Sequence, residues 1–377
     1  MKENLARFFR QETVLCAALA LAALSMLLVP PDAAYSSYID FRTLAILFCL
    51  MGAMSGLQKT GVFQWTAQAL LSRVKKTRQL VWILVLLCFF SSMAVTNDVA
   101  LLTFVPFTFT VLHMLGAEAK KRLIVPVVVL QTVAANLGSM LTPIGNPQNL
   151  YLYGRAGLSP GAFVLLMLPY TCVSLLLILA WSTAQTRTCS APIAVSFQEQ
   201  VRLSGKGASL AVYLLLFVVD LLTVARAVPY PLALILTVVG LLLTDKSVFA
   251  RVDYSLLLTF VGFFIFIGNM GRLPVFYRFL QQIVSGNELL AGAAASQIIS
   301  NVPAALLLSG FTSDFSPLII GVNIGGLGTL IASMASLISY KLVVWEEGAV
   351  KGAYFRCFTW TNLAFLVLLL LAAFILR

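Results

Sequence analysis

The sequence TPIGNPQN, residues 142–149, interrupts a long apolar segment and decides how this chain can fold. Two prolines and a glycine within this stretch cannot continue an α-helix. Apolar residues precede it at 123–140 and follow it at 150–153, so the helix breaks at a depth where hydrocarbon is expected. Irregular backbone at that depth is tolerated only against protein or a water-filled cavity. The stretch therefore predicts a binding site inside a membrane protein.

The composition is that of a membrane protein. Of 377 residues, 60% are hydrophobic and 10% are charged, whereas a soluble domain has about 25% charged residues. A helix needs about 20 apolar residues to cross about 30 Å of hydrocarbon. The sequence therefore predicts an all-α polytopic fold of about nine full spans and two shorter helical hairpins. We expect the spans at residues 13–29, 41–57, 123–153, 163–181, 210–222, 231–244, 254–269, 316–340 and 355–376.

Basic residues predict the orientation. With the N-terminus in the cytoplasm, all but six of the 25 lysines and arginines fall in cytoplasmic segments, which is the positive-inside pattern. The C-terminus is then outside, and we expect a multi-pass protein of a bacterial-type inner membrane, surrounded by lipid. The first apolar run is expected to remain as a span and not to be removed as a signal peptide.

Other protein classes would need residues that the sequence does not offer. The net charge of +11 comes from the loops between spans, so no nucleic-acid partner is expected. The six cysteines are scattered and His113 is the only histidine, which gives no metal cluster and no cofactor beyond a coupling cation. An intramembrane enzyme would have only Asp98, Asp220 and His113 to use. A channel would need a filter repeated between subunits, and none is evident.

The two halves of the chain share landmarks in the same order. An Asp followed by an aromatic residue, Asp40 in one half and Asp253 in the other, precedes a long apolar run. The motif TNDVALL then matches SNVPAAL, and ANLG around Asn136 matches VNIG around Asn323. The first repeat starts outside and the second inside, so the repeats are inverted, which is typical of secondary transporters.

Each repeat is expected to hold one hairpin and one broken helix. The second hairpin has arms 287–299 and 302–311, which reach only about 20 and 15 Å and cannot cross the membrane. It should be re-entrant, with Ser300 and Asn301 at its tip. The arms of the first hairpin are longer, so two short spans remain an alternative there. We expect a first half at 1–183 with hairpin 80–113 and broken helix 123–153, a cytoplasmic linker at 184–209, and a second half at 210–377 with hairpin 287–311 and broken helix 316–340.

The tips and breaks supply the candidate solute ligands. A re-entrant tip leaves backbone N–H groups unpaired where the second arm begins, and the helix dipole adds positive charge there. Such an end binds anions, while nearby carbonyl groups can bind cations. Helix capping by the polar side chains and close packing through the glycines are the alternatives. The candidate ligands are Thr96, Asn97, Thr142, Gly145, Asn146, Asn149, Ser300, Asn301, Gly326 and Thr329.

Asp98 is the single carboxylate at a hairpin tip. Ionisable residues at this depth are functional by default, so we expect Asp98 to carry a proton or to coordinate a coupling cation, with Asn136 and Asn323 as further residues of the ion site. A charge that only stabilises the helix N-terminus is the alternative. Asp220 also lies in a span, and an ion pair with Arg226 is expected for it.

At these motifs the chain resembles the ion transporter superfamily, which includes arsenite permeases, sodium/proton antiporters, citrate carriers and divalent anion–sodium symporters. The resemblance covers roughly residues 40–376 and rests on TND at 96–98, TPIGNPQN, SNVP at 300–303 and GVNIGG at 321–326. It implies two hairpins and two broken helices around one site, often in a homodimer, and a core that moves against a scaffold like an elevator.

The resemblance also separates two groups of solutes. The dicarboxylate symporters carry Ser-Asn-Thr at both tips, whereas Asp98 makes the first tip resemble the arsenite permease and antiporter branch. A carboxylate would repel a dianion unless it were protonated or paired with a cation. The expected function is a secondary-active permease for a small anion or oxyanion, carboxylate-like or arsenite-like, coupled to H⁺ or Na⁺. A Na⁺/H⁺ antiporter is the alternative.

Overall fold

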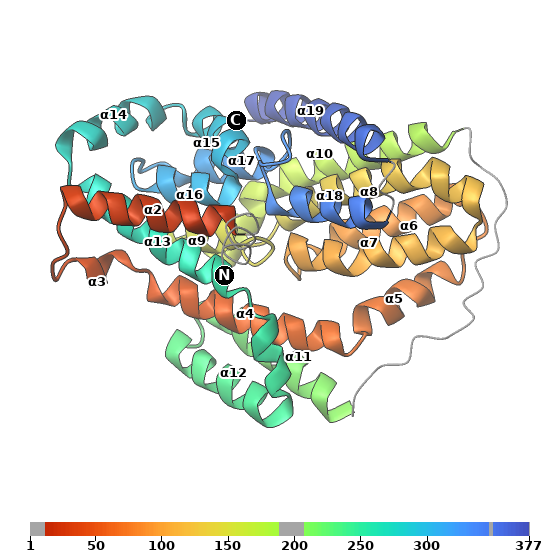
Figure 1. Cartoon of the computed structure of the whole chain (residues 1–377), viewed down its shortest axis with the longest axis horizontal. Helices are drawn as coiled ribbons and strands as arrows, with labels where there is room; N and C mark the ends of the chain where they lie inside the picture. Colours follow the sequence, from red (N-terminus) through yellow and green to blue (C-terminus); the bar gives the residue numbers. More distant parts are fainter. Residues whose placement is uncertain (1–11, 188–206, 347–349, 377) are drawn as a thin grey trace, which may run out of the picture.

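The computed structural model describes residues 12–187, 207–346 and 350–376, and within these ranges it contains helices and turns but no strand (Figure 1). Most of the predicted linker, 184–209, lies outside the described residues.

In the described part of the chain, seven helices are long and apolar enough to cross a membrane. One of them, α7 (Asn97–Met114), is an arm of the first predicted hairpin. The other six occur where spans were predicted, which confirms the all-helical polytopic fold. They are α4 (Phe41–Lys59), α8 (Ala117–Ser139), α10 (Pro160–Thr186), α11 (Gly207–Val224), α13 (Tyr254–Gly271) and α19 (Lys351–Leu376).

Three predicted spans are built from shorter helices. The helices α2 (Thr13–Leu28) and α12 (Tyr230–Thr244) have 16 and 15 residues, or about 24 and 22 Å of length. α2 packs closely along α13, because Gly262 of α13 meets the backbone of Ala18. The predicted span at 316–340 is divided into α17 (Phe315–Ile324) and α18 (Met334–Glu346).

Both predicted hairpins are helix pairs joined by short turns. The second consists of α15 (Glu288–Ile299) and α16 (Asn301–Ser309), with lengths of about 18 and 14 Å, so neither arm can cross the hydrocarbon. The first consists of α6 (Thr77–Ser91) and α7, with about 22 and 27 Å. Two short spans therefore remain an alternative for the first hairpin.

The stretch 142–149 breaks its helix as predicted. α8 ends at Ser139, and α9 (Pro147–Ala156) begins with a proline at its first position, where a missing N–H does no harm. Four smaller elements complete the described fold: α3 (Tyr35–Tyr38), α5 (Val62–Leu71), the 3₁₀ helix η1 (Lys246–Arg251) and α14 (Pro274–Val284).

The repeats begin in the same way. Asp40 and Asp253 cap α4 and α13 with almost identical backbone angles, φ −80° and ψ 83° against φ −80° and ψ 84°. Each carboxylate accepts the N–H three residues on, from Thr43 at 3.0 Å and from Leu256 at 2.9 Å. The local geometry thus supports the repeat that the motif order predicts.

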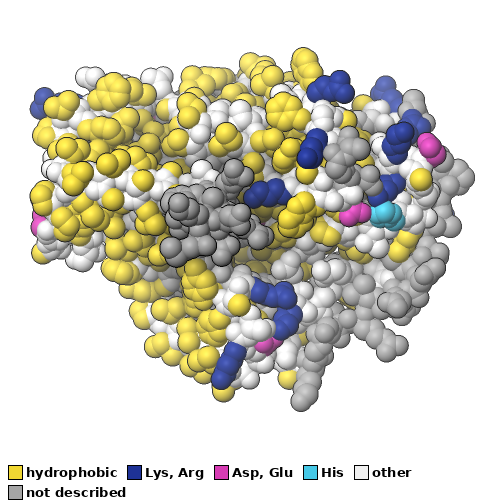
Figure 2. Space-filling model, in the orientation of Figure 1, with side chains coloured by type: hydrophobic (Ala, Val, Ile, Leu, Met, Phe, Trp, Pro, Cys, Tyr) yellow, Lys and Arg dark blue, Asp and Glu magenta, His cyan; other side chains and the backbone are white. Residues whose placement is uncertain are grey.

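The hairpins and broken helices lie between two outer groups of helices. Figure 1 shows α4, α11 and α12 along one edge and α10 and α19 along the opposite edge. In the central helix α8, 89% of the 18-residue apolar stretch is buried, against 33% in α10 and 28% in α11. The outer helices therefore present apolar faces to their surroundings. In Figure 2, the Lys and Arg side chains gather towards the end where α6 and α8 begin and α18 ends, and the other end is mostly hydrophobic.

Candidate functional site

The two hairpin tips are held by equivalent backbone contacts. The Asn97 N–H donates to the carbonyl oxygen of Gly145 at 3.2 Å, and the Asn301 N–H donates to that of Ala332 at 2.9 Å. In both halves, the first N–H of the second arm is thus bound by the break in the broken helix of the same repeat. The four predicted interruptions therefore lie together and are not scattered through the fold.

A layer of buried amides then joins the two repeats. Asn136 Oδ1 accepts hydrogen bonds from Asn97 Nδ2 at 3.0 Å and from Ser333 Oγ at 2.9 Å. Asn323 Nδ2 donates to Asn149 Oδ1 at 2.6 Å. All five side chains are buried. Each repeat therefore fixes side chains of the other at the depth of the breaks.

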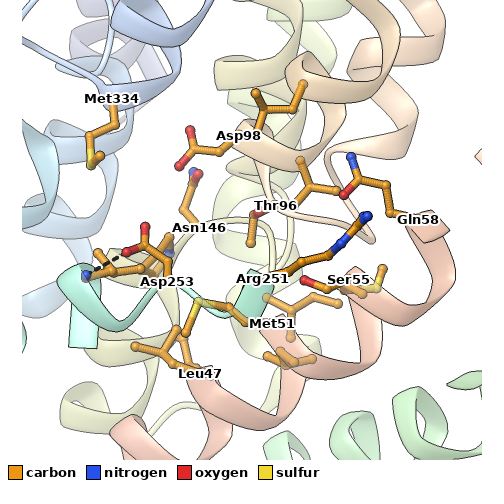
Figure 3. A pocket seen from close by; sticks show the side chains of 18 of the residues that line it. Leu47, Met51, Ser55, Gln58, Thr96, Asp98, Asn146, Arg251, Asp253 and Met334 are labelled. Carbon is orange, nitrogen blue, oxygen red and sulfur yellow. Dashed lines mark hydrogen bonds between the residues drawn. The ribbon is translucent and has the colours of Figure 1, made fainter. Parts of the chain in front are cut away.

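A cavity of about 380 Å³ opens beside the first tip. It is bounded by α4, by the tip before α7, by α9 and by the beginnings of α13 and α18. Figure 3 shows Asp98 and Asn146 pointing towards one another at this cavity, with Thr96 next to them and Gln58 on the far side of Thr96. Its polar lining residues are Ser55, Gln58, Thr96, Asp98, Asn146, Arg251 and Asp253.

Two further cavities meet the second tip. One of about 10 Å³ lies between both tips, which is about enough space for one water molecule. It is lined by the polar residues Asn97, Asp98, Asn146, Gln148, Asn301 and Ser333. The other, of about 550 Å³, reaches Ser300, whose φ of 74° forms the sharp turn of the tip. This cavity also touches Asp253 and Met334, which line the first cavity as well.

Several buried polar atoms around the tips have no hydrogen-bond partner among the described residues. Three are acceptors, namely Asp98 Oδ1, Asn146 Oδ1 and Asn323 Oδ1. Two are donors, Asn136 Nδ2 and Gln148 Nε2. Buried polar atoms are normally paired, and each unpaired one costs about 1–3 kcal/mol. Acceptor oxygens suit a cation and N–H donors suit an anion, so the site offers unpartnered groups of both kinds.

Five of the ten predicted ligands line these cavities. Thr96, Asn97, Asn146, Ser300 and Asn301 line at least one of them, as does Asp98. Gly145 contributes the carbonyl that binds the first tip. Gly326 lies against the second tip, where an added Cβ would be 3.0 Å from Asn301 Nδ2.

The remaining predicted residues point elsewhere. The Thr142 hydroxyl donates to the Met93 carbonyl, and the Asn149 amide donates to the carbonyl groups of Ser139 and Thr142. Thr329 is exposed and donates its hydroxyl to the Gln297 carbonyl at 3.0 Å. These contacts stabilise the breaks. Of the predicted ion-site residues, Asn136 has its oxygen occupied by two donors, whereas the Asn323 oxygen is unpartnered within the described part of the chain.

The expected ion pair between Asp220 and Arg226 is wrong. Asp220 is 1% exposed and neither carboxylate oxygen has a hydrogen-bond partner in the described ranges. Arg226 is exposed, and its guanidinium lies 5.7 Å from the ring centroid of Tyr153. The side chains diverge because Arg226 follows the end of α11, where the chain has φ 65° and turns away.

Sequence reasoning missed several residues of the site. Arg251 and Asp253 line the large cavity, and Ser333 and Gln148 line the small one. Gln297 donates to the carbonyl groups of residues 325 and 327 and so closes the second break. A glutamine near the end of a mostly apolar arm was a usable signal. The others follow from the tertiary fold alone.

Ion pairs tie the helices together at the basic end. Lys59 at the end of α4 pairs with Asp245 and also donates to Ser247 at 2.6 Å. The hydrogen bond from Lys59 lowers the pKa of Asp245 to about 2. His113 of α7 lies 2.8 Å from Glu346 of α18, and this contact lowers the pKa of Glu346.

Comparisons with known proteins agree with this architecture. The family model described as citrate transporter matches residues 10–313. The chain is 33% identical to an uncharacterized transporter of Methanocaldococcus jannaschii over 306 residues, 81% of each chain. It is 30% identical to the inner membrane protein YbiR of Escherichia coli K12 over 309 residues, 81% of this chain and 80% of the relative. A silicon efflux transporter of Oryza sativa subsp. japonica is 30% identical over 141 residues, 37% of this chain and 28% of the relative. The resemblance to the ion transporter superfamily is thereby confirmed: the chain belongs to the citrate transporter family and is a membrane transporter.

Proposed function

We propose that this transporter is a secondary-active permease that moves a small anion or oxyanion together with H⁺ or Na⁺, and that Asp98 is its coupling site. The observation that carries the proposal is the set of helix N-termini around the small cavity between the tips. The helices α7, α9, α16 and α18 begin at Asn97, Pro147, Asn301 and Met334, and all four residues line this cavity.

These N-termini favour an anion. Each helix N-terminus acts like about half of a positive charge and so attracts an anion. Asp98 stands at the same place with a carboxylate. An anionic solute would therefore be repelled unless Asp98 were protonated or paired with a cation, which couples the two binding events.

The size and family of the site support a small carboxylate or oxyanion as solute. The cavity of about 380 Å³ is within the range of small-molecule sites, about 300–1,000 Å³. The matching family model is described as a citrate transporter, and one relative is named a silicon efflux transporter. We propose citrate-like carboxylates and arsenite-like oxyanions as the classes to test first.

We also propose that the cavity of about 380 Å³ faces the cytoplasm. Its lining includes Gln58, next to Lys59, and Arg251, and Lys59 belongs to the basic end that the positive-inside pattern places inside the cell. In an elevator mechanism, the hairpins and broken helices would carry the site past α4 to the opposite face. The N-terminus would be cytoplasmic and the protein would reside in the inner membrane as a homodimer.

Transport by proteoliposomes tests the coupling. Uptake of labelled citrate, arsenite and sulfate would be measured with imposed H⁺ or Na⁺ gradients, for the unchanged chain and for Asp98→Asn. We expect the variant to lose gradient-driven accumulation. Asp314→Asn changes an exposed carboxylate and serves as the matched control. Unchanged pH and Na⁺ dependence in Asp98→Asn would remove Asp98 from the mechanism.

One observation favours a second candidate, a Na⁺/H⁺ antiporter. The unpartnered oxygens of Asp98, Asn146 and Asn323 are hard ligands of the kind that bind small cations. Na⁺-driven proton movement in vesicles that contain no transportable anion would establish this alternative. Proton movement that requires citrate or arsenite would support the permease.

A further inference from the structure

A second polar cavity lies at the opposite end of α4 from Lys59. It measures about 180 Å³ and is lined by Asp40, Arg42 and Thr43 at the start of α4 and by Tyr153, Gly154 and Arg155 of α9. The positive-inside pattern leaves only five described arginines on this side of the membrane, namely Arg42, Arg155, Arg226, Arg272 and Arg278. Two of them line this cavity, and a third, Arg226, lies over the ring of Tyr153.

The charge around this cavity is positive. Asp40 is the one carboxylate of its lining, and it is engaged in the helix cap, where it accepts the N–H of Thr43 at 3.0 Å and the Thr43 hydroxyl. Arg42 uses one guanidinium nitrogen to donate to the Thr223 carbonyl at 3.3 Å. A guanidinium has five N–H donors in a planar fork that matches carboxylate and phosphate groups.

The third arginine is kept near the cavity at an unfavourable backbone position. Arg226 has φ 65° just after α11, where glycine is the usual residue because it has no Cβ. The Tyr153 hydroxyl donates to the Val224 carbonyl at 2.8 Å and fixes this turn beside α9. An arginine at a position where glycine fits better supports a role for its charge.

The cavity lies next to the proposed solute site. Leu150 of α9 lines both this cavity and the one of about 380 Å³. On α4, Ile46 lines the cavity of about 180 Å³ and Leu47 lines the cavity of about 380 Å³. A thin apolar layer at Leu150 therefore separates the arginines from Asp98 and Asn146.

We propose that this cavity, the outer arginine cavity, binds a small oxyanion through Arg42 and Arg155 at the outer end of the transport path. The ligand class is a carboxylate, sulfate or phosphate group, either free or on a lipid headgroup. Its place in transport rests on the proposed function, but anion binding at the cavity does not. The field of clustered charges in a cleft concentrates ions of opposite sign by about 10- to 1,000-fold.

A thiol placed in the cavity reports this field. An added Cβ at Gly154 meets only the Thr43 hydroxyl, at 3.9 Å, so Gly154→Cys fits. Its reaction with an anionic and with a cationic methanethiosulfonate would be timed in detergent, with the unchanged chain as blank. We expect the anionic reagent to react at least about tenfold faster. That preference should fall in Arg42→Gln/Arg155→Gln and stay in Arg278→Gln, which lies outside the lining. Thr43→Cys is the second reporter if Gly154→Cys does not fold.

Protection experiments identify the source of the anion. Slower labelling with millimolar sulfate or citrate in lipid-free detergent supports a site for a free anion. Slower labelling only in phosphatidylglycerol nanodiscs supports a site for a lipid phosphate. Equal rates for the two reagents, unchanged by the arginine substitutions, would overturn the proposal. The transport assay of Asp98→Asn does not involve these arginines. The proposed coupling site and the proposed anion site can therefore be refuted separately.

Discussion

Replacing Asn136 by alanine should weaken the joint between the two repeats. Asn136 is 3% exposed, and its oxygen accepts hydrogen bonds from Asn97 Nδ2 at 3.0 Å and Ser333 Oγ at 2.9 Å. Asn97 belongs to the first hairpin tip and Ser333 to the second break. One substitution therefore removes both bonds and leaves two buried donors without this acceptor.

The size of the effect depends on what the released donors find. Side-chain hydrogen bonds in membrane proteins contribute about 0.6 kcal/mol on average and about 1.7 at most, whereas a buried donor left unpaired costs about 1–3 kcal/mol. Asn97 and Ser333 both border the small cavity between the tips, so part of the loss can be compensated there. We expect Asn136→Ala to lower the free energy of unfolding by about 1–3 kcal/mol. This value lies between the loss of two average side-chain hydrogen bonds and the full penalty for two unpaired donors. Ser333→Ala should cost about 0.5–1 kcal/mol.

Reversible unfolding in mixed micelles of detergent and sodium dodecyl sulfate, followed by tryptophan fluorescence, measures these free energies. In the double variant the two effects should fall short of their sum by about 0.5–1 kcal/mol, the cost of Ser333→Ala alone, because both remove the same bond. Asn362→Ala is the matched control, since its amide donates to Phe358 of its own helix. A cost for Asn136→Ala no larger than in this control, or strictly additive effects, would refute the reasoning.

Two further predictions concern packing and pH. Gly325→Ala should destabilise by about 1–3 kcal/mol, because its Cβ would lie 2.7 Å from the backbone of Ala293. A Cβ added at Gly352 would have no other atom within 4 Å, so the melting temperature of Gly352→Ala should be unchanged or slightly raised. The pKa of Asp245 is lowered to about 2 by Lys59, so this pair stabilises the fold at neutral pH and the contribution fades as pH falls from about 4 towards 2. Both side chains are partly exposed, which limits the contribution to about 1 kcal/mol or less. Lys59→Met should remove that part of the acid-induced drop in melting temperature, and an unchanged drop would contradict this.

The breaks could be predicted from sequence because they are set by local chemistry. A single proline is tolerated inside α7, α8 and α10, but Pro143, Gly145 and Pro147 within five residues strongly disfavour a continuous helix. The observed helices end at Ser139 and restart at Pro147. The second hairpin could be predicted for a similar reason, since the length of an arm limits its reach. Both signals depend on neighbouring residues and not on the tertiary fold.

The direction of side chains within a break could not be predicted. Thr329 and Asn146 both occupy irregular backbone, yet one is exposed and the other is 3% exposed beside Asp98. No periodicity applies where the helix has ended, so the neighbouring helices decide. Asp220 and Arg226 illustrate the same limit. Six residues along a helix turn a side chain by about 240°, so the two would have faced different ways even without the turn after α11.

The inversion of the repeats would explain how the proposed site serves both an anion and a cation. Each hairpin and each broken helix creates one helix N-terminus in an apolar segment. Because the repeats are inverted, the four N-termini meet instead of pointing in the same direction, and they do so at the small cavity between the tips. Together they amount to about two positive charges, of which the carboxylate of Asp98 offsets about half.

The proposed coupling follows from this balance. A proton or cation at Asp98 cancels that offset and strengthens the attraction for an anion. Linkage is reciprocal, so an anion that binds more tightly with the cation present must increase the affinity for the cation by the same factor. Asp98→Asn keeps a polar side chain but fixes the charge at zero. Anion affinity in the variant should then be independent of pH and Na⁺, while in the unchanged chain it should rise as either cation concentration rises. An equilibrium titration with citrate or arsenite at several pH values, without any transport, separates these two outcomes.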